Sequence, residues 1–351
     1  MKNYPKVAVV ILCWNGKTFL EAFLPPLLKT TYPNVDYYVA DNASTDDSVA
    51  FVKANYPSVK LIENGTNSGF ATGYNLALKQ VSADYYVLLN QDVEVSPGWI
   101  EPVIELMEND KTIAICQPKL KAQLEKNKFE YAGAAGGHID RFGYAFTKGR
   151  IFNEVEADKG QYDNIADIVW ATGACLFIKA DLYHKFGGLD DDFFAHMEEV
   201  DLCWRIKNAG YAIKLCPQSI TYHVGGGSLE YGSPMKTYLN YRNNLSMLVK
   251  NLSTSSLFFI LPLRFLLDIV SAYKLLLEGE PKHFWAVFKA HFYFITRFFY
   301  LLNKRWKVNK VVNTNRIAPR NKSGFYKGLI IVDFFLKAKH KFSDLSQKSF
   351  Y

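Results

Sequence analysis

A polar tripeptide, Asn90-Gln91-Asp92, directly follows the apolar run Tyr85–Leu89. Five consecutive apolar or aromatic residues predict a strand that is buried on both faces. In an open α/β sheet, ligands bind beyond the carboxyl ends of the strands, so Asp92 stands where a ligand is expected. A carboxylate at that place can hold a hard divalent cation, which in turn holds phosphate oxygens. Taken alone, the tripeptide fits a simple turn equally well.

An acidic segment, Asp190–Asp201, contains the adjacent residues Glu198 and Glu199. Two neighbouring side chains at the start of a helix point in different directions. One of them can therefore enter a cleft as a general base while the other caps or orients the helix. Asp201 suits a structural role at the head of the same helix. The alternative is a solvated acidic loop, but the phenylalanine pair inside the segment argues against full exposure.

A single histidine, His223, precedes Val224 and three consecutive glycines. Glycine lets the backbone come close to a ligand, and imidazole is a common metal ligand. A carboxylate and an imidazole around a divalent ion, with phosphate oxygens completing the shell, form a chemically sound site. A lone histidine also occurs often as a packing or surface residue. Asp92 and His223 are thus candidate ligands for Mg²⁺ or Mn²⁺.

Short apolar runs alternate with helical patterns over the first part of the chain. The predicted strands are Val7–Cys13, Asp36–Ala40, Val59–Glu63 and Tyr85–Leu89. This alternation predicts an α/β fold with a doubly wound, mostly parallel sheet and right-handed crossovers. Later in the chain, Lys121–Asp163 predicts short strands and a mobile glycine-rich loop at 132–137.

The residue after the second predicted strand is Asp41, and dinucleotide-binding domains place an acidic residue there to bind ribose hydroxyls. The loop after the first strand, Cys13–Lys17, lacks the Gly-x-Gly-x-x-Gly pattern that lets a backbone wrap a pyrophosphate. A nicotinamide-dependent oxidoreductase is therefore disfavoured. A nucleotide would be held in another way, with a metal as the counter-ion of its phosphates.

The composition also limits the class of protein. The chain has 351 residues, 49% of them hydrophobic and 15% aromatic, which is enough for a large core and an additional segment. Its five cysteines are scattered and odd in number, which predicts buried, reduced thiols in a cytosolic protein. The N-terminal residues lead straight into a strand and show no secretory signal pattern.

Seven stretches in the right order resemble the family-2 inverting glycosyltransferases of the GT-A fold, and among them the rhamnosyltransferase-like branch. The resemblance spans about residues 5–250. It rests on Val7–Gly16, Asp41–Asp46, Asn67–Asn75, Asn90–Asp92, Thr172–Ala174, Phe194–Leu202 and His223–Ser228.

The resemblance implies roles for the matching positions. Glu199 would be the base that deprotonates the acceptor hydroxyl, with Glu198 as the second candidate, although the family has Asp at the position of Glu199. Asp92 would be the metal-binding end of the family's Asp-x-Asp motif. This chain has Asn90 in place of the first aspartate of that motif, so His223 becomes more important as a second metal ligand. The predicted nucleotide contacts are Trp14, Asn15, Asp41, Asn67, Gly69, Asn75 and Asn90, and the predicted donor and acceptor pocket contains Trp170, Thr172, Gly173 and Asp201.

The implied activity is the transfer of a sugar such as rhamnose, with inversion, from a dTDP- or UDP-linked donor. The acceptor would be a hydroxyl of a surface polysaccharide or a lipid-linked glycan. An alternative is a catalytically degenerate protein that binds sugar nucleotides or acts as a scaffold, which only Asn90 supports. A nucleic-acid-binding protein is a further alternative, but the basic C-terminal region contains no recognised RNA- or DNA-binding module.

The composition changes after Leu252, which predicts a catalytic domain at 1–252 and a helical, aromatic and basic region at 253–351. Ser253–Leu277 is apolar but interrupted by proline and charged residues, which disfavours a membrane-spanning helix. His283–Trp306 combines aromatic and cationic residues, as a helix lying in a membrane interface does, and Gly324–Lys341 repeats this composition. We therefore predict a cytoplasmic enzyme that binds peripherally to the inner face of the cell membrane. A helical lid on the catalytic domain is the alternative.

Overall fold

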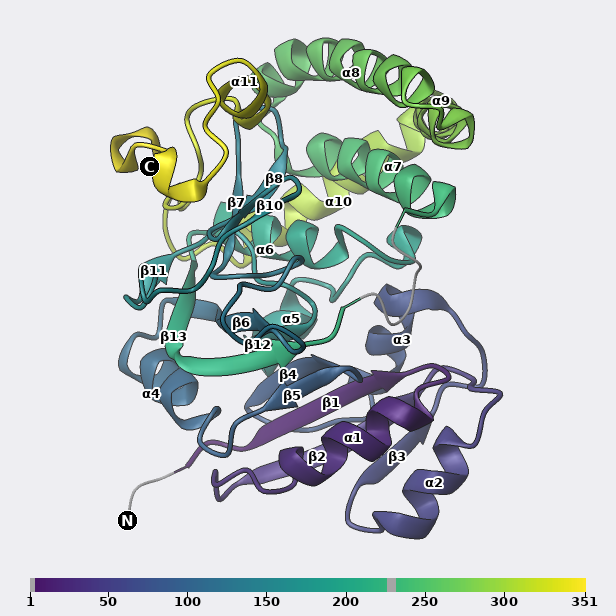
Figure 1. The fold of residues 1–351 in the computed structure, drawn as a ribbon, viewed down its shortest axis with the longest axis vertical. Helices are drawn as coiled ribbons and strands as arrows, with labels where there is room; N and C mark the ends of the chain where they lie inside the picture. The colour runs from purple at the N-terminus through teal and green to yellow at the C-terminus, as the bar shows by residue number, and fades with distance from the viewer. Residues whose placement is uncertain (1–3, 226–231) are drawn as a thin grey trace.

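The computed structural model describes residues 4–225 and 232–351, and its first quarter alternates strands with helices (Figure 1). The strands are β1 (Val7–Cys13), β2 (Val35–Asp41), β3 (Lys60–Glu63) and β4 (Tyr85–Asn90). The helices between them are α1 (Lys17–Leu27), α2 (Ser48–Asn55) and α3 (Gly69–Leu78). The four strands pair in the order β3-β2-β1-β4, and every pair is parallel. The predicted α/β alternation is confirmed.

Five more strands extend this sheet beyond β4. They are β5 (Val93–Val95), β6 (Ile113–Ala122), β11 (Ala166–Asp167), β12 (Cys175–Lys179) and β13 (Ala212–His223). Strand β12 runs antiparallel between β4 and β6, whereas β13 is parallel to β6 and pairs antiparallel with β5 and β11. The result is a mixed nine-stranded sheet, parallel in its N-terminal half.

Helices cover both faces of the sheet, because successive residues of a buried strand point to opposite faces. Val7 and Val9 of β1 pack in one core cluster with α1 and α4 (Glu101–Asn109), whereas Ala8 and Val10 pack in the other with α3 and α6 (Glu198–Asn208). A short helix, α5 (Ala180–Lys185), follows β12. All five cysteines are free and buried, as predicted.

The segment predicted to hold short strands forms a second, four-stranded sheet. Its strands are β7 (Gly137–Ile139), β8 (Ala145–Thr147), β9 (Arg150–Ile151) and β10 (Glu154–Val155). The prediction of a mobile loop at 132–137 is wrong, because Gly133 to Gly137 are buried. A β-carbon on Gly133 would lie 2.4 Å from Thr172, and one on Gly137 would lie 2.0 Å from the ring of Trp170. The glycines there serve close packing.

The C-terminal part of the chain is helical. Its helices are α7 (Pro234–Asn251), α8 (Thr254–Leu277), α9 (Pro281–Thr296), α10 (Phe298–Thr314) and α11 (Ile330–Phe335). Residues 254–277 form one unbroken helix, and the interpretation that this segment does not span a membrane stays a prediction. Among the described residues, α8 is the one helix whose length and composition would allow it to cross a membrane. The predicted helix across 283–306 is divided at Arg297 into α9 and α10.

The end of the chain differs from the interfacial helix that its composition suggested. Tyr326, Ile330 and Phe342 are buried and pack with Phe146 of β8 in a separate small core, whereas the buried Phe325 packs in the main core. The second half of the predicted membrane-interfacial region therefore completes the fold around the small sheet. The proposed domain boundary near residue 252 stays a prediction.

Candidate functional site

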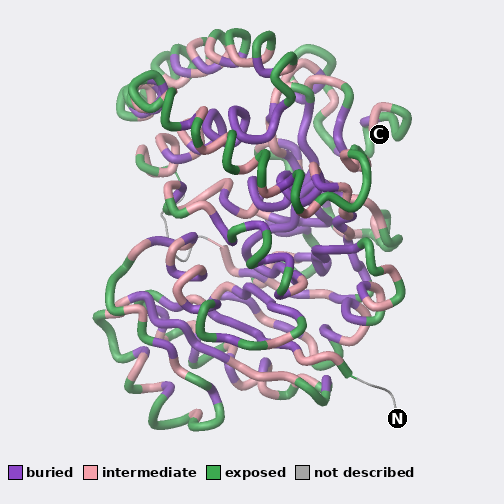
Figure 2. The backbone as a smooth tube through the Cα atoms, turned by 180° about the vertical axis from the view of Figure 1, so that it is seen from behind, coloured by how far each residue is buried: buried purple, intermediate pink, exposed green. Residues whose placement is uncertain are grey.

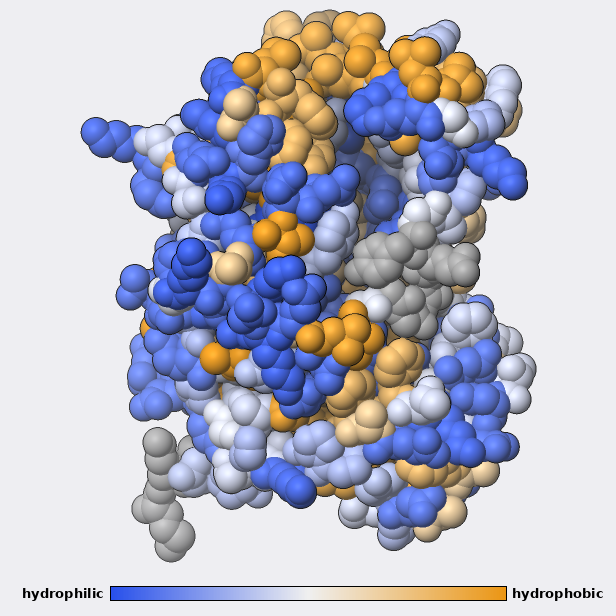
Figure 3. All heavy atoms as spheres, viewed as in Figure 1, coloured by the Kyte–Doolittle hydropathy of each residue, from blue (hydrophilic) through white to orange (hydrophobic). Residues whose placement is uncertain are grey.

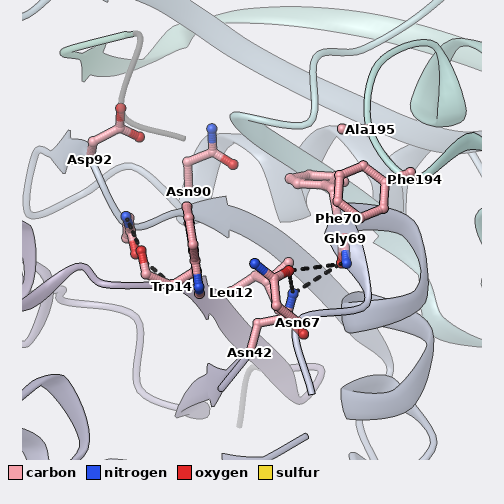
Figure 4. Close-up of a pocket in the computed structure, with 11 residues that line it drawn as sticks. Leu12, Trp14, Asn42, Asn67, Gly69, Phe70, Asn90, Asp92, Phe194 and Ala195 are labelled. Atoms are coloured by element: carbon pink, nitrogen blue, oxygen red, sulfur yellow. Dashed lines mark hydrogen bonds between the residues drawn. The ribbon is translucent and has the colours of Figure 1, made fainter. Parts of the chain in front are cut away.

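A cleft opens at the carboxyl ends of β1, β2 and β4, where the parallel half of the sheet is expected to bind ligands (Figure 4). The cleft has a cavity volume of about 200 Å³. One wall comes from residues 190–197, which precede α6 and are called the acidic loop below. The lining residues are Leu12, Trp14, Asn42, Asn67, Gly69, Phe70, Asn90, Gln91, Asp92, Phe194 and Ala195.

Trp14 lies in the wall of the cleft, with 40% of its surface exposed. An exposed aromatic ring offers a face on which a nucleobase can stack. The side-chain amide of Gln91 holds the Trp14 backbone: it accepts from the Trp14 N–H at 3.0 Å and donates to the Trp14 carbonyl at 3.3 Å. The sequence analysis assigned no role to Gln91, although its position between the two predicted site residues Asn90 and Asp92 indicated that it lies at the same strand end.

The loops after β1 and β2 are hydrogen-bonded to each other. Asn15 has a left-handed φ of 47°, and its side-chain oxygen accepts from the backbone N–H of Thr45 at 2.7 Å. Asp41 is buried and accepts from the backbone N–H of Ser44 at 3.1 Å. Asn15 and Asp41 adjoin the lining residues Trp14 and Asn42 in sequence but do not line the cleft themselves. Their role as nucleotide contacts stays a prediction.

An amide pair joins the end of β2 to the start of α3. The side-chain amide of Asn42 donates to Asn67 Oδ1 at 3.0 Å and to the Gly69 carbonyl at 3.2 Å, and Asn67 Oδ1 also accepts from the Gly69 N–H (Figure 4). Asn67 and Gly69, both predicted, thus lie on the cleft wall together with Asn42. The sequence analysis did not predict Asn42, because it assigned the nucleotide contact to the preceding residue, Asp41.

Gly69 is where the acidic loop approaches α3 most closely. Its φ is +81°, and a β-carbon would lie 2.5 Å from the ring of Phe194 and 2.6 Å from its carbonyl oxygen. That carbonyl accepts from the backbone N–H of Phe70 at 2.6 Å. A side chain at Gly69 would therefore push the acidic loop away from the start of α3.

Asn75 faces away from the cleft and ties α3 to the segment before α6. Its side-chain nitrogen donates to the Leu189 carbonyl and to Asp191 Oδ1, both at 2.8 Å. Its oxygen accepts from the Tyr183 hydroxyl at 2.6 Å. These bonds occupy both ends of the amide, which gives Asn75 a structural role in this structure.

Asp92 and His223, the predicted metal ligands, are in contact. His223 Nε2 lies 3.1 Å from Asp92 Oδ1 and 3.4 Å from the side-chain nitrogen of Asn90. The other ring nitrogen, Nδ1, lies 3.1 Å from Oε1 of the buried Glu130. Burial alone would lower the pKa of His223, but the two carboxylates outweigh it and raise the pKa to about 10. Sequence reasoning missed Glu130.

Glu198 and Glu199 begin α6, and both have a buried side-chain oxygen without a hydrogen-bond partner. Glu198 is buried, and both burial and the neighbouring charge of Glu199 raise its pKa. Glu199 is half-buried, and burial raises its pKa while a backbone hydrogen bond from Gly173 opposes the shift. A β-carbon on Gly173 would lie 2.8 Å from the ring of Phe70, a lining residue, so Glu199 has a partner beside the cleft wall.

The acidic loop is held in a strained conformation by α7. Phe194, His196 and Met197 have φ values of 63°, 69° and 72°, which are unfavourable for residues with side chains. The side-chain amide of Asn243 donates to the carbonyls of Phe193, Ala195 and His196 at 2.7–3.0 Å. The predictions from sequence contained no residue of α7.

The predicted donor and acceptor pocket is divided by the structure. Trp170 is buried and donates from Nε1 to the His138 carbonyl at 3.0 Å, whereas the backbone of Thr172 is held by Gln117. Asp201 is fully buried and pairs with Arg205 and Lys250 on the far side of α6's first turn, which agrees with a structural role. Gly173 lies next to the ring of Phe70, a lining residue.

Residues 8–168 match the sequence model of glycosyl transferase family 2. This stretch, slightly less than half of the chain, belongs to that glycosyltransferase family. A curated relative, the N-acetylglucosaminyl-diphospho-decaprenol L-rhamnosyltransferase of Mycobacterium tuberculosis, is 23% identical over 61% of this chain and 75% of its own length. Another, the low-salt glycan biosynthesis hexosyltransferase Agl10 of Haloferax volcanii, is 20% identical over 59% of this chain and 65% of its own length.

Solved structures place the transferase in the GT-A fold. The mannosyltransferase PcManGT of Pyrobaculum calidifontis, solved with GDP-Man and Mn²⁺, matches with a TM-score of 0.52 at 14% identity, over 90% of this chain and 88% of that one. GalNAc-T7, solved with UDP, GalNAc and Mn²⁺, matches with a TM-score of 0.56 at 16% identity, over 71% of this chain and 48% of that one. The predicted family and fold are confirmed.

Proposed function

We propose that the transferase moves a sugar, such as rhamnose, from a nucleoside-diphosphate donor to a hydroxyl of a lipid-linked or surface glycan, with inversion at the anomeric carbon. The observation that carries this proposal is the cleft at the strand ends, which brings Trp14, Asn67 and Asp92 together. The similarity to a rhamnosyltransferase that acts on a diphospho-decaprenol-linked sugar supports the choice of donor and acceptor class. The donor nucleotide is dTDP or UDP.

The cleft offers separate groups for the two parts of the donor. The exposed ring of Trp14 and the amides of Asn42 and Asn67 suit the nucleoside, since they supply a stacking face and hydrogen-bonding groups. Asn90 and Asp92 lie at the end of β4 and suit the diphosphate side of the donor. The side chain of Asn90 is neutral and so does not repel a phosphate, and its amide N–H groups can donate a hydrogen bond to a phosphate oxygen.

The residues around Asp92 fit a divalent cation by their chemistry. Asp92 Oδ1 and His223 Nε2, 3.1 Å apart, are two ligand types that Mn²⁺ accepts, and the diphosphate would supply further oxygens. Because the raised pKa of His223 leaves its ring protonated near neutral pH, a bound cation would have to displace that proton. Within the described residues, no group of three or more histidine, cysteine, aspartate or glutamate side chains converges on a metal position. A bound Mg²⁺ or Mn²⁺ would stabilise the negative charge of the leaving diphosphate.

Glu199 is the proposed general base. Its half-buried carboxylate has one oxygen, Oε2, without a hydrogen-bond partner. This carboxylate accepts the proton of the acceptor hydroxyl, whose oxygen attacks the anomeric carbon from the face opposite the diphosphate. The bond between that carbon and the diphosphate oxygen breaks, and its electron pair leaves with the nucleoside diphosphate. A single displacement inverts the centre and needs one base. By analogy with glycoside hydrolysis, retention by double displacement would also need a carboxylate nucleophile.

The proposal is tested with a panel of dTDP-, UDP- and GDP-linked sugars, with and without Mg²⁺ or Mn²⁺. A donor should raise the unfolding temperature, since a ligand that binds only the folded state stabilises it. The product formed on a polyprenyl-diphosphate-sugar acceptor is then analysed by NMR for its anomeric configuration. Asp92→Ala should weaken protection and abolish transfer, and EDTA should do the same to the wild type. Asp181→Ala, in an exposed ion pair on α5, is the matched control.

Three outcomes contradict the proposal in distinct ways. If no sugar nucleotide protects the folded chain, the donor assignment is wrong. Protection without transfer to any acceptor favours the alternative of a catalytically degenerate sugar-nucleotide-binding protein. A product that retains the donor's anomeric configuration excludes the single displacement.

A further inference from the structure

The outer face of α8 is apolar along its whole length. Phe258, Phe259, Leu266 and Val270 are 77%, 69%, 58% and 59% exposed, and they follow one another at helical spacing on one side of the helix. The one exposed charge within α8 is Lys274, which pairs with Glu278 just beyond the helix end. Figure 3 shows the resulting apolar surface over α8 and α9, at the end of the molecule opposite β1, β2 and β3 (Figure 1).

The opposite face of α8 is fixed to the rest of the protein by polar contacts. Arg264 pairs with Asp268 one turn later at 3.0 Å and donates to the Phe142 carbonyl at 3.0 Å. Asp268 also lies 3.4 Å from Nε2 of His291 on α9, and all three of these charged or titratable side chains are buried. A helix that crossed a bilayer would pull this ion pair away from its partners, so α8 lies along the protein with its apolar side outward.

The exposed surface continues onto α9 and gains positive charge there. Trp285, Phe292 and Ile295 are mostly exposed, and Figure 2 shows the outer sides of α8 and α9 as exposed while their inner sides are buried. Lys289 is exposed next to these residues on the side facing α7, where its ammonium lies 5.0 Å from the Tyr238 ring. Lys282 lies two turns before it on the same side of α9.

The charge of this surface indicates what covers it. Within the described residues, no carboxylate forms an ion pair with Lys282, Lys289 or Arg297. Between residues 281 and 323 the sequence contains ten lysines and arginines and no aspartate or glutamate. An apolar, aromatic surface edged by unpaired cations matches the headgroup region of an anionic bilayer, where aromatic rings and cationic side chains are both favoured.

We propose that the outer face of α8 and α9 binds peripherally to the surface of an anionic lipid bilayer. The apolar residues of α8 enter the boundary between headgroups and acyl chains, and Lys282, Lys289 and Arg297 contact the lipid phosphates. A second copy of the chain is a poorer occupant, because the surface offers these cations no matching cluster of acidic residues. This inference is independent of the proposed function, since it concerns a different surface and is measured without donor or acceptor.

The test uses the full chain and vesicles of phosphatidylcholine with 30% or no phosphatidylglycerol, separated by sedimentation. The wild type should sediment with the anionic vesicles, and 0.5 M salt should weaken this binding without abolishing it, because salt screens the charges and leaves apolar burial intact. A double variant, Phe259→Glu with Leu266→Glu, should bind at least tenfold more weakly. Both positions are exposed, so folding should be unaffected. Leu124→Glu, at an 83% exposed position of the catalytic half, is the matched control and should bind as the wild type does.

A second variant pair tests the cationic part. Lys282→Glu with Lys289→Glu should lose binding to anionic vesicles, whereas Lys53→Glu with Lys126→Glu, at exposed positions near the sheet, should keep it. The proposal is overturned if the wild-type chain stays in the supernatant at low salt. It is also overturned if Leu124→Glu loses as much vesicle binding as the double variant Phe259→Glu, Leu266→Glu. Chain that resists extraction by alkaline carbonate would show a spanning helix and overturn the peripheral assignment. A dimer that the Phe259→Glu, Leu266→Glu variant dissociates, with no vesicle binding, would assign this surface to a second copy.

Discussion

The support that α7 gives to the acidic loop can be removed by one substitution, Asn243→Ala. Asn243 is 1% exposed and its side-chain amide lies within 2.7–3.0 Å of three carbonyls, those of Phe193, Ala195 and His196. An amide has two hydrogens, so the substitution removes the equivalent of two donated hydrogen bonds. The Phe193 carbonyl still accepts from Arg242 at 2.9 Å, whereas the carbonyls of Ala195 and His196 lose this donor. At about 0.5–1.5 kcal/mol for each bond, the free energy of unfolding should fall by about 1–3 kcal/mol. For a chain of this size, that corresponds to a fall in Tm of roughly 2–6 °C.

The larger effect is expected on turnover. The left-handed conformations of Phe194, His196 and Met197 cost on the order of 1–3 kcal/mol each, and they persist only while the surroundings hold them. Without Asn243 the loop relaxes toward ordinary φ values, which shifts Phe194 in the cleft wall and the start of α6. A displacement of about 1 Å at a reacting group can cost about 10²-fold in rate. We therefore expect kcat to fall about 10- to 100-fold.

Asn244→Ala is the matched control, because it removes the same side chain from the next position of α7. Asn244 is also buried, but its amide donates to the Gly143 carbonyl at 2.8 Å, far from the acidic loop in sequence. Initial rates at saturating donor, well below both Tm values, should show a low kcat for Asn243→Ala and a nearly normal one for Asn244→Ala. If both variants lose Tm and kcat in equal proportion, Asn243 contributes stability alone and the positioning role is refuted.

Two further predictions concern titratable groups. Glu199→Gln should lower kcat by about 10²–10⁴-fold with donor protection unchanged, and Glu198→Gln by less; the reverse order would make Glu198 the base. Burial, and to a lesser degree the charge of Lys148, lowers the pKa of His138 to about 3. Between about pH 6.5 and pH 3, His138 is therefore protonated in the unfolded chain and neutral in the folded chain. Stability should thus fall as pH drops from 6.5 towards 3, by up to about 1.4 kcal/mol per pH unit. His138→Asn, whose amide can still donate to the Gly324 carbonyl, should flatten this slope in denaturant titrations, and an unchanged slope would refute the assignment.

The parallel half of the sheet was predictable because its signals are local. Val7–Cys13 is a continuous apolar run, and the structure gives the same bounds for β1. The polar residues at the strand ends were found for the same reason, since Asp92 is the second residue after β4. Contacts between distant segments were not predictable. Glu130 contacts His223, which lies about ninety residues later in the chain, and Asn243 contacts a loop about fifty residues earlier in the chain.

Helix α8 has an apolar outer face that its sequence did not reveal, because its charged residues pair within one face of the helix. Arg264 and Asp268 looked like interruptions of an apolar segment, but their spacing of four residues places them on the same side of a helix. There they pair with each other and with His291, and the remaining face stays apolar. Pro262 is exposed in the third turn and does not end the helix. The helix survives because α9 and the Phe142 carbonyl hold its inner side.

The C-terminal helices also hold the acidic loop, which decides how their role must be tested. Lys304 of α10 pairs with Asp190 and with Asp192 at 2.5 Å, and the Tyr300 hydroxyl donates to Asp192 at 2.8 Å. Lys250, at the end of α7, pairs with Asp190 from the other side. A chain cut after α7 would therefore lose both the apolar outer face and two anchors of the loop that leads into the proposed base. Loss of activity in such a truncated chain would say nothing about membrane binding. Substitutions confined to the outer face of α8 leave Lys304 and Tyr300 in place, so they separate the two roles.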